Sequence, residues 1–253
     1  MAEAVVAFNR GIIEATADLV CAYKPNSAYY EALGERGHWV LVQTIAAVRE
    51  LAPTVPVLLD AKRADIGETS AAYATAVFDD LGADAVTVHP YFGGAALAPF
   101  LERADRGVIV MGANSHPGAG ELQDVLVGPE QEPLYRYLSR VVARDWNRHG
   151  NCGLTAGATQ PEKIRQIREV APTLPLLILG IGAQGGDLDS TVGAGMDANG
   201  AGMIISTSRA ISYASAGEDF REAARAVAES FSARIAVARD TAMAERQADD
   251  PRT

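Results

Sequence analysis

The stretch VPVLLDAKRADIGETSAAYATAVFDDL, residues 55–81, joins a short apolar run to a longer amphipathic segment. The apolar run, residues 55–61, shows no clean alternation of polar and apolar side chains, which is typical of a strand buried on both faces of a sheet. Residues 70–81 have the apolar spacing of a helix. A buried strand followed by a helix predicts one repeat of a parallel α/β fold.

The same strand and helix pattern recurs along the whole chain. Further strands are predicted at residues 20–24, 85–89, 107–112, 153–157, 176–180 and 203–206, and further helices at residues 4–16, 95–103, 132–147, 161–170 and 218–245. A βα repeat that continues over this length fits a (β/α)8 TIM barrel better than an open doubly wound sheet, which usually shows a GxGxxG turn after its first strand. The sequence therefore predicts an α/β protein of the TIM-barrel class.

Seven predicted strands are one fewer than a closed barrel of this class requires. Because a helix, residues 4–16, precedes the first predicted strand, we expect the barrel's first strand to be missing from this chain and to lie upstream of Met1 in a longer form. No Pro/Gly/Ser-rich linker divides the sequence, so residues 1–247 are predicted to be a single domain and residues 248–253 a frayed tail. Residues 118–133, the longest connection, are expected to be a mobile loop over the active site.

Composition excludes several classes of protein. The chain has 253 residues, of which 48% are hydrophobic and 21% charged, as in an ordinary globular protein. A net charge of −10 argues against a nucleic-acid partner, since phosphate backbones are bound by clustered Lys and Arg. No apolar run is long enough for a membrane span and no cationic leader opens the chain, so we expect a cytoplasmic protein. Two cysteines, Cys21 and Cys152, support neither a disulfide framework nor a zinc ribbon.

Charged residues gather where the predicted strands end, which is where a TIM barrel builds its active site. Lys24 ends one predicted strand, Asp60 and Lys62 end the next, and Asp65 follows within one turn. Asp60 and Lys62 are two residues apart, so both side chains should point to the same face. A lone lysine here would more often be a structural ion pair, but four alternating charges at one barrel mouth predict a catalytic network.

Two other segments predict substrate binding. The glycine-rich run GIGAQGGD, residues 180–187, and Arg209 follow the last two predicted strands, where barrels of this class often hold phosphate with backbone N–H groups. The alternative is a simple tight turn. Ser115, in the segment NSHPGA, could offer its hydroxyl and amide to a planar polar ligand. His116 lacks a nucleophile elbow nearby, His89 is predicted to be a hydrogen-bonding residue of the rim, and no metal-ligand motif is present.

These segments together resemble orotidine 5′-monophosphate decarboxylase. DAKRADIGET, residues 60–69, is similar to the DxKxxDI motif of that family, and CAYKPN, SHPGA, GATQPE and GIGAQGGD with Arg209 occur in the family's order over residues 6–214. The DAKR and KPN forms resemble the longer bacterial branch. The DxKxxD motif alone is shared with the 3-keto-gulonate phosphate decarboxylases. Leu179 stands where the family usually has Pro, and the family's first strand, ending in a ribose-binding Asp, has no counterpart here.

The resemblance implies a role for each residue in converting orotidine 5′-monophosphate to uridine 5′-monophosphate for pyrimidine synthesis without a cofactor. Lys62 would protonate C6, with Asp60 against the substrate carboxylate and Lys24 bound to Asp60 and the ribose. Ser115 would read the pyrimidine. The implied active unit is a homodimer with shared sites, and two further groups are implied: Asp65 and Thr69 for the partner's site, and Gln184, Gly185 and Arg209 for the phosphate.

Three alternatives remain at this point. A Schiff-base aldolase would need an uncharged Lys62, which neighbouring carboxylates disfavour. A phosphosugar decarboxylase of the same superfamily would use magnesium and lose activity to a chelator. A diverged paralogue would bind the nucleotide without turning it over.

Overall fold

The computed structural model describes residues 1–181 and 185–248. Contacts divide the chain into two units: unit 1 comprises residues 1–110, 149–151 and 208–229, and unit 2 comprises the described parts of residues 111–148, 152–207 and 230–253. The single domain over residues 1–247 stays a prediction, and residues 249–253 of the expected frayed tail lie outside the described part.

Three parallel strands form the sheet of unit 1. They are β1 (Leu58–Arg63), β2 (Ala85–Val88) and β3 (Gly107–Val110), with Leu58 opposite Ala85 and Ala85 opposite Gly107. Their apolar residues are almost fully buried, as predicted for parallel strands covered on both faces. The strands predicted at residues 55–61, 85–89 and 107–112 are therefore confirmed, with ends that differ by a few residues.

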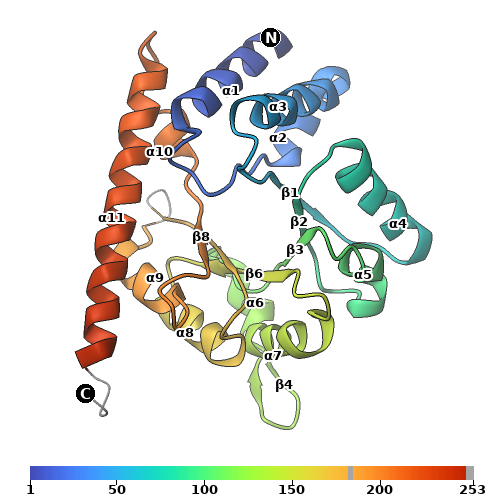
Figure 1. Ribbon diagram of the computed structural model, residues 1–253. Coiled ribbons are helices and arrows are strands. Elements are labelled where there is room, and N and C mark those ends of the chain that lie inside the picture. The colour runs from blue at the N-terminus through green and yellow to red at the C-terminus, as the bar shows by residue number, and fades with distance from the viewer. Residues whose placement is uncertain (182–184, 249–253) are drawn as a thin grey trace. The chain divides into compact units, whose positions relative to one another are not determined.

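Helices cover the sheet of unit 1. The helical segments are α1 (Ala2–Thr16), α2 (Ser27–Glu31), the 3-10 turn Gly34–Arg36, α3 (Gly37–Leu51), α4 (Gly67–Thr75) with a π-helical continuation over Ala76–Asp80, α5 (Gly94–Leu101), α10 (Arg209–Ser212) and the start of α11 (Phe220–Ala248). In Figure 1, α1 lies beside α3 and α4 lies beside α5. The alternation of strand and helix predicted from the sequence is confirmed.

The strand predicted at residues 20–24 is wrong in its extent. Only isolated parallel bridges form here, Tyr23 to Val57 and Asn26 to Asp60. Tyr23 donates its N–H to Pro56 and accepts from Leu58, but Pro25 has no N–H to continue the ladder. The first regular strand within residues 1–181 is therefore β1.

Unit 2 repeats the arrangement with β6 (Cys152–Gly157), β7 (Leu176–Leu179) and β8 (Met203–Ile205), all parallel. Its helical segments are the 3-10 turn Pro117–Ala119, α6 (Gly120–Gln123), α7 (Leu134–Val141) with a π-helical continuation over Val142–Trp146, α8 (Pro161–Val170), α9 (Leu188–Gly195) and the rest of α11. In Figure 1, α8 lies between α7 and α9, and the contacts of these helices agree. The helix predicted at residues 161–170 is confirmed at both ends.

The longest predicted connection has structure of its own. Within residues 118–133, α6 is followed by a short antiparallel pair, β4 (Leu126–Val127) and β5 (Glu132–Pro133). Because Glu132 and Pro133 belong to this pair, the helix predicted from residue 132 begins at Leu134 instead. The mobility expected for this segment stays a prediction.

Candidate active site

Asp60 of β1 is the centre of a charged network in unit 1. Its Oδ1 accepts hydrogen bonds from Lys62 Nζ at 2.6 Å and Thr87 Oγ1 at 3.0 Å. Its Oδ2 accepts from Lys24 Nζ at 3.0 Å and Asn26 Nδ2 at 3.2 Å. Each carboxylate oxygen thus receives one ammonium donor and one neutral donor.

The electrostatics of Asp60 are set by burial and by the two lysines. The Asp60 side chain is 6% exposed, against 19% for Lys24 and 37% for Lys62. Burial alone would raise the Asp60 pKa, but the charges and hydrogen bonds of Lys24 and Lys62 outweigh it, so that its pKa lies below the ordinary value. Asp60 is therefore a carboxylate at neutral pH, and the more exposed Lys62 ammonium is the group a ligand can reach.

Lys62 has an unusual backbone. Its φ is +48°, in the left-handed region that residues other than glycine seldom adopt. The register of β1 against β2 also shifts between Leu59 and Arg63. Such bulges re-aim side chains near active sites. The expected contact of Lys62 with Asp60 exists, but it arises from this bulge and not from simple alternation along a regular strand.

Asp65 and Thr69 do not join the cluster in the described part of unit 1. Asp65 Oδ1 accepts from the N–H of Ile66 at 2.7 Å, and its backbone is held by Ser70. Thr69 lies exposed in the first turn of α4. Of the four alternating charges expected to lie together, three are in contact: Lys24, Asp60 and Lys62. Asp65 lies in a surface turn next to Ile66, which is 63% exposed.

Ser115 lies in unit 2, in the segment that follows Val110. Its hydroxyl donates to the Leu179 carbonyl at 3.3 Å, and it packs closely on Gly157 at the end of β6. A Cβ at residue 157 would lie 2.5 Å from Ser115 Oγ, so only glycine fits there. The neighbouring His116 is exposed and accepts from the N–H of Gly118 through Nδ1 at 3.2 Å.

The glycine-rich segment after β7 also belongs to unit 2. Gly180 and Gly185 have φ of +102° and +82°, which the turn requires and other residues would resist. Gly185 is exposed, while Gln184 lies outside the described residues. Asp187 accepts from the N–H of Ser190 at 2.8 Å and caps α9. Because a carboxylate already occupies the first turn of α9, an anion at this segment would depend on the turn's own amides.

Arg209 is exposed and opens the short helix α10 in unit 1. Lys24, Asp60 and Lys62 are thus the predicted site residues that the structure brings into contact.

Sequence reasoning missed two residues around this cluster, Asn26 and Thr87. Asn26 and Thr87 bind Asp60 directly, and His89 follows β2, where partial desolvation and the charge of Lys62 lower its pKa. The available signal was topological, because β2 pairs with β1 and ends at Val88 beside Arg63. A polar residue inside an otherwise apolar strand, as Thr87 is, marks a buried partner.

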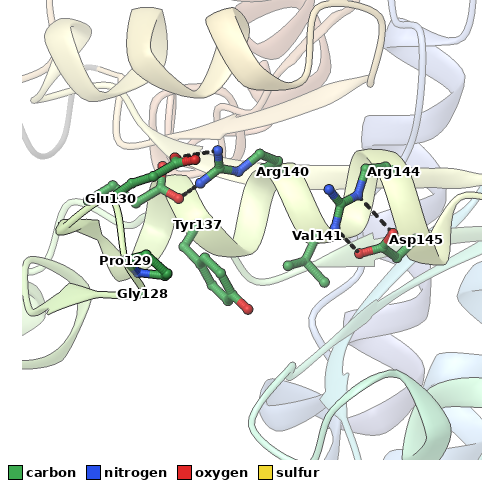
Figure 2. Close-up of a pocket in the computed structure, with 9 residues that line it drawn as sticks. Gly128, Pro129, Glu130, Tyr137, Arg140, Val141, Arg144 and Asp145 are labelled. Atoms are coloured by element: carbon green, nitrogen blue, oxygen red, sulfur yellow. Dashed lines mark hydrogen bonds and ion pairs between the residues drawn. The ribbon is translucent and has the colours of Figure 1, made fainter.

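A cavity of about 310 Å³ lies elsewhere in unit 2, between the β4–β5 hairpin and α7 (Figure 2). Figure 2 shows Arg140 directed at Glu130 and Arg144 paired with Asp145. The N–O distances of these two ion pairs are 2.6 Å and 2.9 Å. Arg140 also pairs with the buried Glu132. Because these charges neutralise one another, the cavity offers no excess positive charge to a phosphate.

The described residues show neither a cluster of metal-ligating side chains nor a helix that could span a membrane. In residues 1–181 and 185–248 no group of three or more His, Cys, Asp or Glu side chains is arranged to hold a metal ion. Across the same residues, every helix is too short or too polar to cross a bilayer.

Comparison with known proteins decides the family. The sequence model of the Orotidine 5′-phosphate decarboxylase / HUMPS family matches residues 7–227. The chain belongs to this family. A curated relative from Thermomicrobium roseum, named orotidine 5′-phosphate decarboxylase, is 54% identical over 228 residues, covering 89% of this chain and 79% of the relative. Another of the same name from Herpetosiphon aurantiacus is 50% identical over 230 residues, covering 91% and 83%.

Solved structures agree with the family assignment. The OMP decarboxylase of Leishmania donovani has a TM-score of 0.83 at 37% identity, covering 94% of this chain and 89% of that one. The fold class predicted from the repeat of strands and helices, an α/β TIM barrel, is thereby confirmed. The resemblance drawn from DAKRADIGET and the accompanying segments is confirmed as well.

Proposed function

We propose that this chain converts orotidine 5′-monophosphate to uridine 5′-monophosphate, the carboxy-lyase step of pyrimidine synthesis. The observation that carries the proposal is the Lys24–Asp60–Lys62 cluster in a member of this family. The cluster places a lysine side chain beside a carboxylate, and the decarboxylation needs a positive charge where the carbanion forms. The bond from C6 to the carboxylate carbon breaks, carbon dioxide leaves, and the electron pair stays on C6.

Lys62 is the proposed acid. The carbanion at C6 has no electron sink, so a fixed ammonium facing it lowers the barrier and then supplies the proton. The ion pair with Asp60 at 2.6 Å holds the Lys62 Nζ in place. The Schiff-base alternative would require Lys62 to leave this ion pair before its nitrogen could attack a carbonyl carbon. After protonation of C6, the neutral Lys62 regains a proton from solvent.

Asp60 is proposed to lie against the substrate carboxylate. Its two oxygens are saturated by four donors, so it cannot turn away from an incoming anion. Departure of neutral carbon dioxide removes the repulsion between the two carboxylates, which favours the transition state over the ground state. Lys24 is proposed to bind the ribose as well as Asp60.

Four residues are proposed to bind the rest of the nucleotide. Ser115 reads the pyrimidine amide, and Gln184, Gly185 and Arg209 hold the phosphate. The exposed guanidinium of Arg209 and the exposed, positive-φ backbone of Gly185 support this assignment, since both can donate to a phosphate oxygen.

A homodimer with shared sites is proposed for the active unit. The turn at Asp65 and Thr69 lies at the surface beside Ile66, and the exposed Tyr91 and Phe92 follow the neighbouring strand β2. Mixing Lys62→Ala protein with Asp65→Ala protein should restore activity, because one site of each heterodimer regains both residues. No recovery after confirmed subunit exchange contradicts shared sites. The predicted cytoplasmic location likewise remains a proposal.

The test of the proposed function is the loss of orotidine monophosphate absorbance on adding the protein. Turnover that survives a chelator supports the proposal. Uridine monophosphate binding without turnover selects the non-catalytic paralogue. Chelator-sensitive decarboxylation of a keto-sugar phosphate, with the nucleotide left intact, selects the phosphosugar enzyme.

A further inference from the structure

The hydroxyl of Thr87 makes two hydrogen bonds to the proposed catalytic pair. As a donor it binds Asp60 Oδ1 at 3.0 Å, and as an acceptor it receives the backbone N–H of Lys62 at 2.9 Å. Thr87 is 1% exposed in β2. One fixed hydroxyl therefore touches both residues of the pair from the neighbouring strand.

The position of Thr87 explains how Lys62 can hold its left-handed backbone. The bulge between Leu59 and Arg63 takes the Lys62 N–H out of the regular ladder between β1 and β2. A buried N–H without a partner is costly, and the Thr87 hydroxyl supplies that partner. The side chain of β2 thus replaces the ladder bond that the bulge removes.

The same hydroxyl limits how Asp60 can rotate. Lys62 Nζ and Thr87 Oγ1 both bind Oδ1, but the lysine chain is flexible and the threonine is a short, β-branched residue with few rotamers. Asn26 makes the equivalent neutral contact with Oδ2 while its own Oδ1 accepts from the N–H of Ala28. The neutral donors fix the carboxylate plane, and the ammonium groups supply charge.

We infer that Thr87 is a positioning residue for the decarboxylation. By bonding the Lys62 backbone and the Asp60 carboxylate with one hydroxyl, it sets the distance between the proton donor and the carboxylate that repels the substrate. The inference rests on the proposed function. It concerns a residue that touches the catalytic pair and not the substrate.

The kinetic test compares Thr87→Val with Thr87→Ser. Thr87→Val keeps the shape and removes the hydroxyl, and kcat should fall about 10–100-fold with KM little changed, the scale of a small misplacement of catalytic groups. Thr87→Ser keeps the hydroxyl and should stay within about threefold of wild type, since only a methyl group is lost. Equal losses in both variants would assign Thr87 to packing alone and overturn the inference.

A matched control separates the hydroxyl's position from its burial. Thr44 of α3 is also buried, donating to the Val40 carbonyl at 2.8 Å and accepting from Asn9 at 2.9 Å. Thr44→Val should lower the melting temperature and leave kcat unchanged. Should Thr87→Val not fold, Thr87→Cys serves in its place, because a thiol is a weak donor.

A titration gives a readout that does not depend on turnover. Lys24 and Lys62 contact Asp60, and His89 lies near enough to Lys62 to feel its charge. Losing the Thr87 donor destabilises the Asp60 carboxylate, so its pKa should rise in carbon-13 carboxyl NMR, assigned with Asp60→Asn. If wild-type protein fails to turn over the nucleotide, the proposed function fails while this titration still reports on Thr87. An unchanged Asp60 titration together with wild-type kcat in Thr87→Val overturns the inference.

Discussion

Asp60 in unit 1 and Arg168 in unit 2 are two shielded charged groups, each with several hydrogen bonds, but the two groups differ in the kind of partner they bind. All four donors to Asp60 are side chains, two of them ammonium groups. Arg168 instead donates to the main-chain carbonyls of Ala171, Pro172, Leu174, Gly195 and Gly202. Burial lowers the pKa of the Arg168 guanidinium, although the Asp197 charge opposes this.

The positions of the two groups explain the difference. Leu174 and Gly202 precede β7 and β8, so Arg168 ties together the amino ends of two strands and the end of α9. Lys62 lies near the carboxyl end of β1, where barrels of this class place their chemistry. A charge bonded to backbone at amino ends stabilises the chain, whereas a charge bonded to other charged side chains at carboxyl ends is available for reaction.

Arg168→Ala should show the largest effect on stability. Several carbonyls would lose a charged donor together, and hydrogen bonds to charged groups contribute about 1.5–3 kcal/mol each, so unfolding should become easier by about 3 kcal/mol or more. Turnover per folded molecule should stay at the wild-type value. Denaturant unfolding and an active-site-normalised assay measure the two quantities.

Arg165 supplies the control on the same helix. It is 53% exposed and pairs with Glu162, so Arg165→Ala should change the free energy of unfolding by no more than about 0.5 kcal/mol. If Arg168→Ala is as mild as Arg165→Ala, the backbone carbonyls do not depend on the guanidinium and the contrast with Asp60 is lost.

Arg209→Ala should affect ligand affinity and not stability. Arg209 is exposed, unlike Arg168, and its proposed partner is the substrate phosphate. Affinity for uridine monophosphate should weaken by about 1.5–3 kcal/mol, the range for charge-assisted hydrogen bonds, while uridine binds mutant and parent equally. Calorimetric titration with both ligands measures this, and equal weakening for the two would make Arg209 structural.

Asp60 should leave a smaller signature in the pH dependence of stability. Its folded-state pKa lies below the ordinary value of 3.8, so its ionisation stabilises the fold above that pH and ceases to do so as the pH falls through the folded-state pKa. The difference in unfolding free energy between wild type and Asp60→Asn should therefore shrink on acidification below about pH 4. A difference that stays constant on acidification would mean that the two lysines do not stabilise the carboxylate.

The sequence predicted the fold class and most elements because parallel strands buried on both faces leave a plain apolar signature. It predicted the wrong extent for residues 20–24, where Pro25 removes a ladder donor although the surrounding residues favour a strand. It also placed the start of one helix at residue 132. Glu132 and Pro133 instead form one strand of a hairpin with Leu126 and Val127, a pairing that the local sequence pattern does not reveal.

The sequence predicted which charged residues form the candidate site, but not how their side chains are arranged. The spacing of Asp60 and Lys62 indicated that they meet, but the bulge that brings them together depends on pairing with β2. Thr87 belongs to no charge pattern, and the signal that could have singled it out was its place as the polar residue of an apolar strand. Asp65 was placed with the other charges because chain proximity does not reveal that its side chain turns back to Ile66.

The most direct test of the central claim is the turnover of orotidine monophosphate by the Lys62→Ala variant. The matched control is Lys163→Ala, because Lys163 of α8 is also paired with a carboxylate, that of Asp124. If Lys62 is both the acid and the cation facing C6, its loss should lower turnover by at least about 10²–10⁴, the range for removing a positioned acid, while the melting temperature and substrate affinity change far less. Lys163→Ala should keep wild-type turnover. A Lys62→Ala protein that retains a tenth of wild-type turnover would contradict the account.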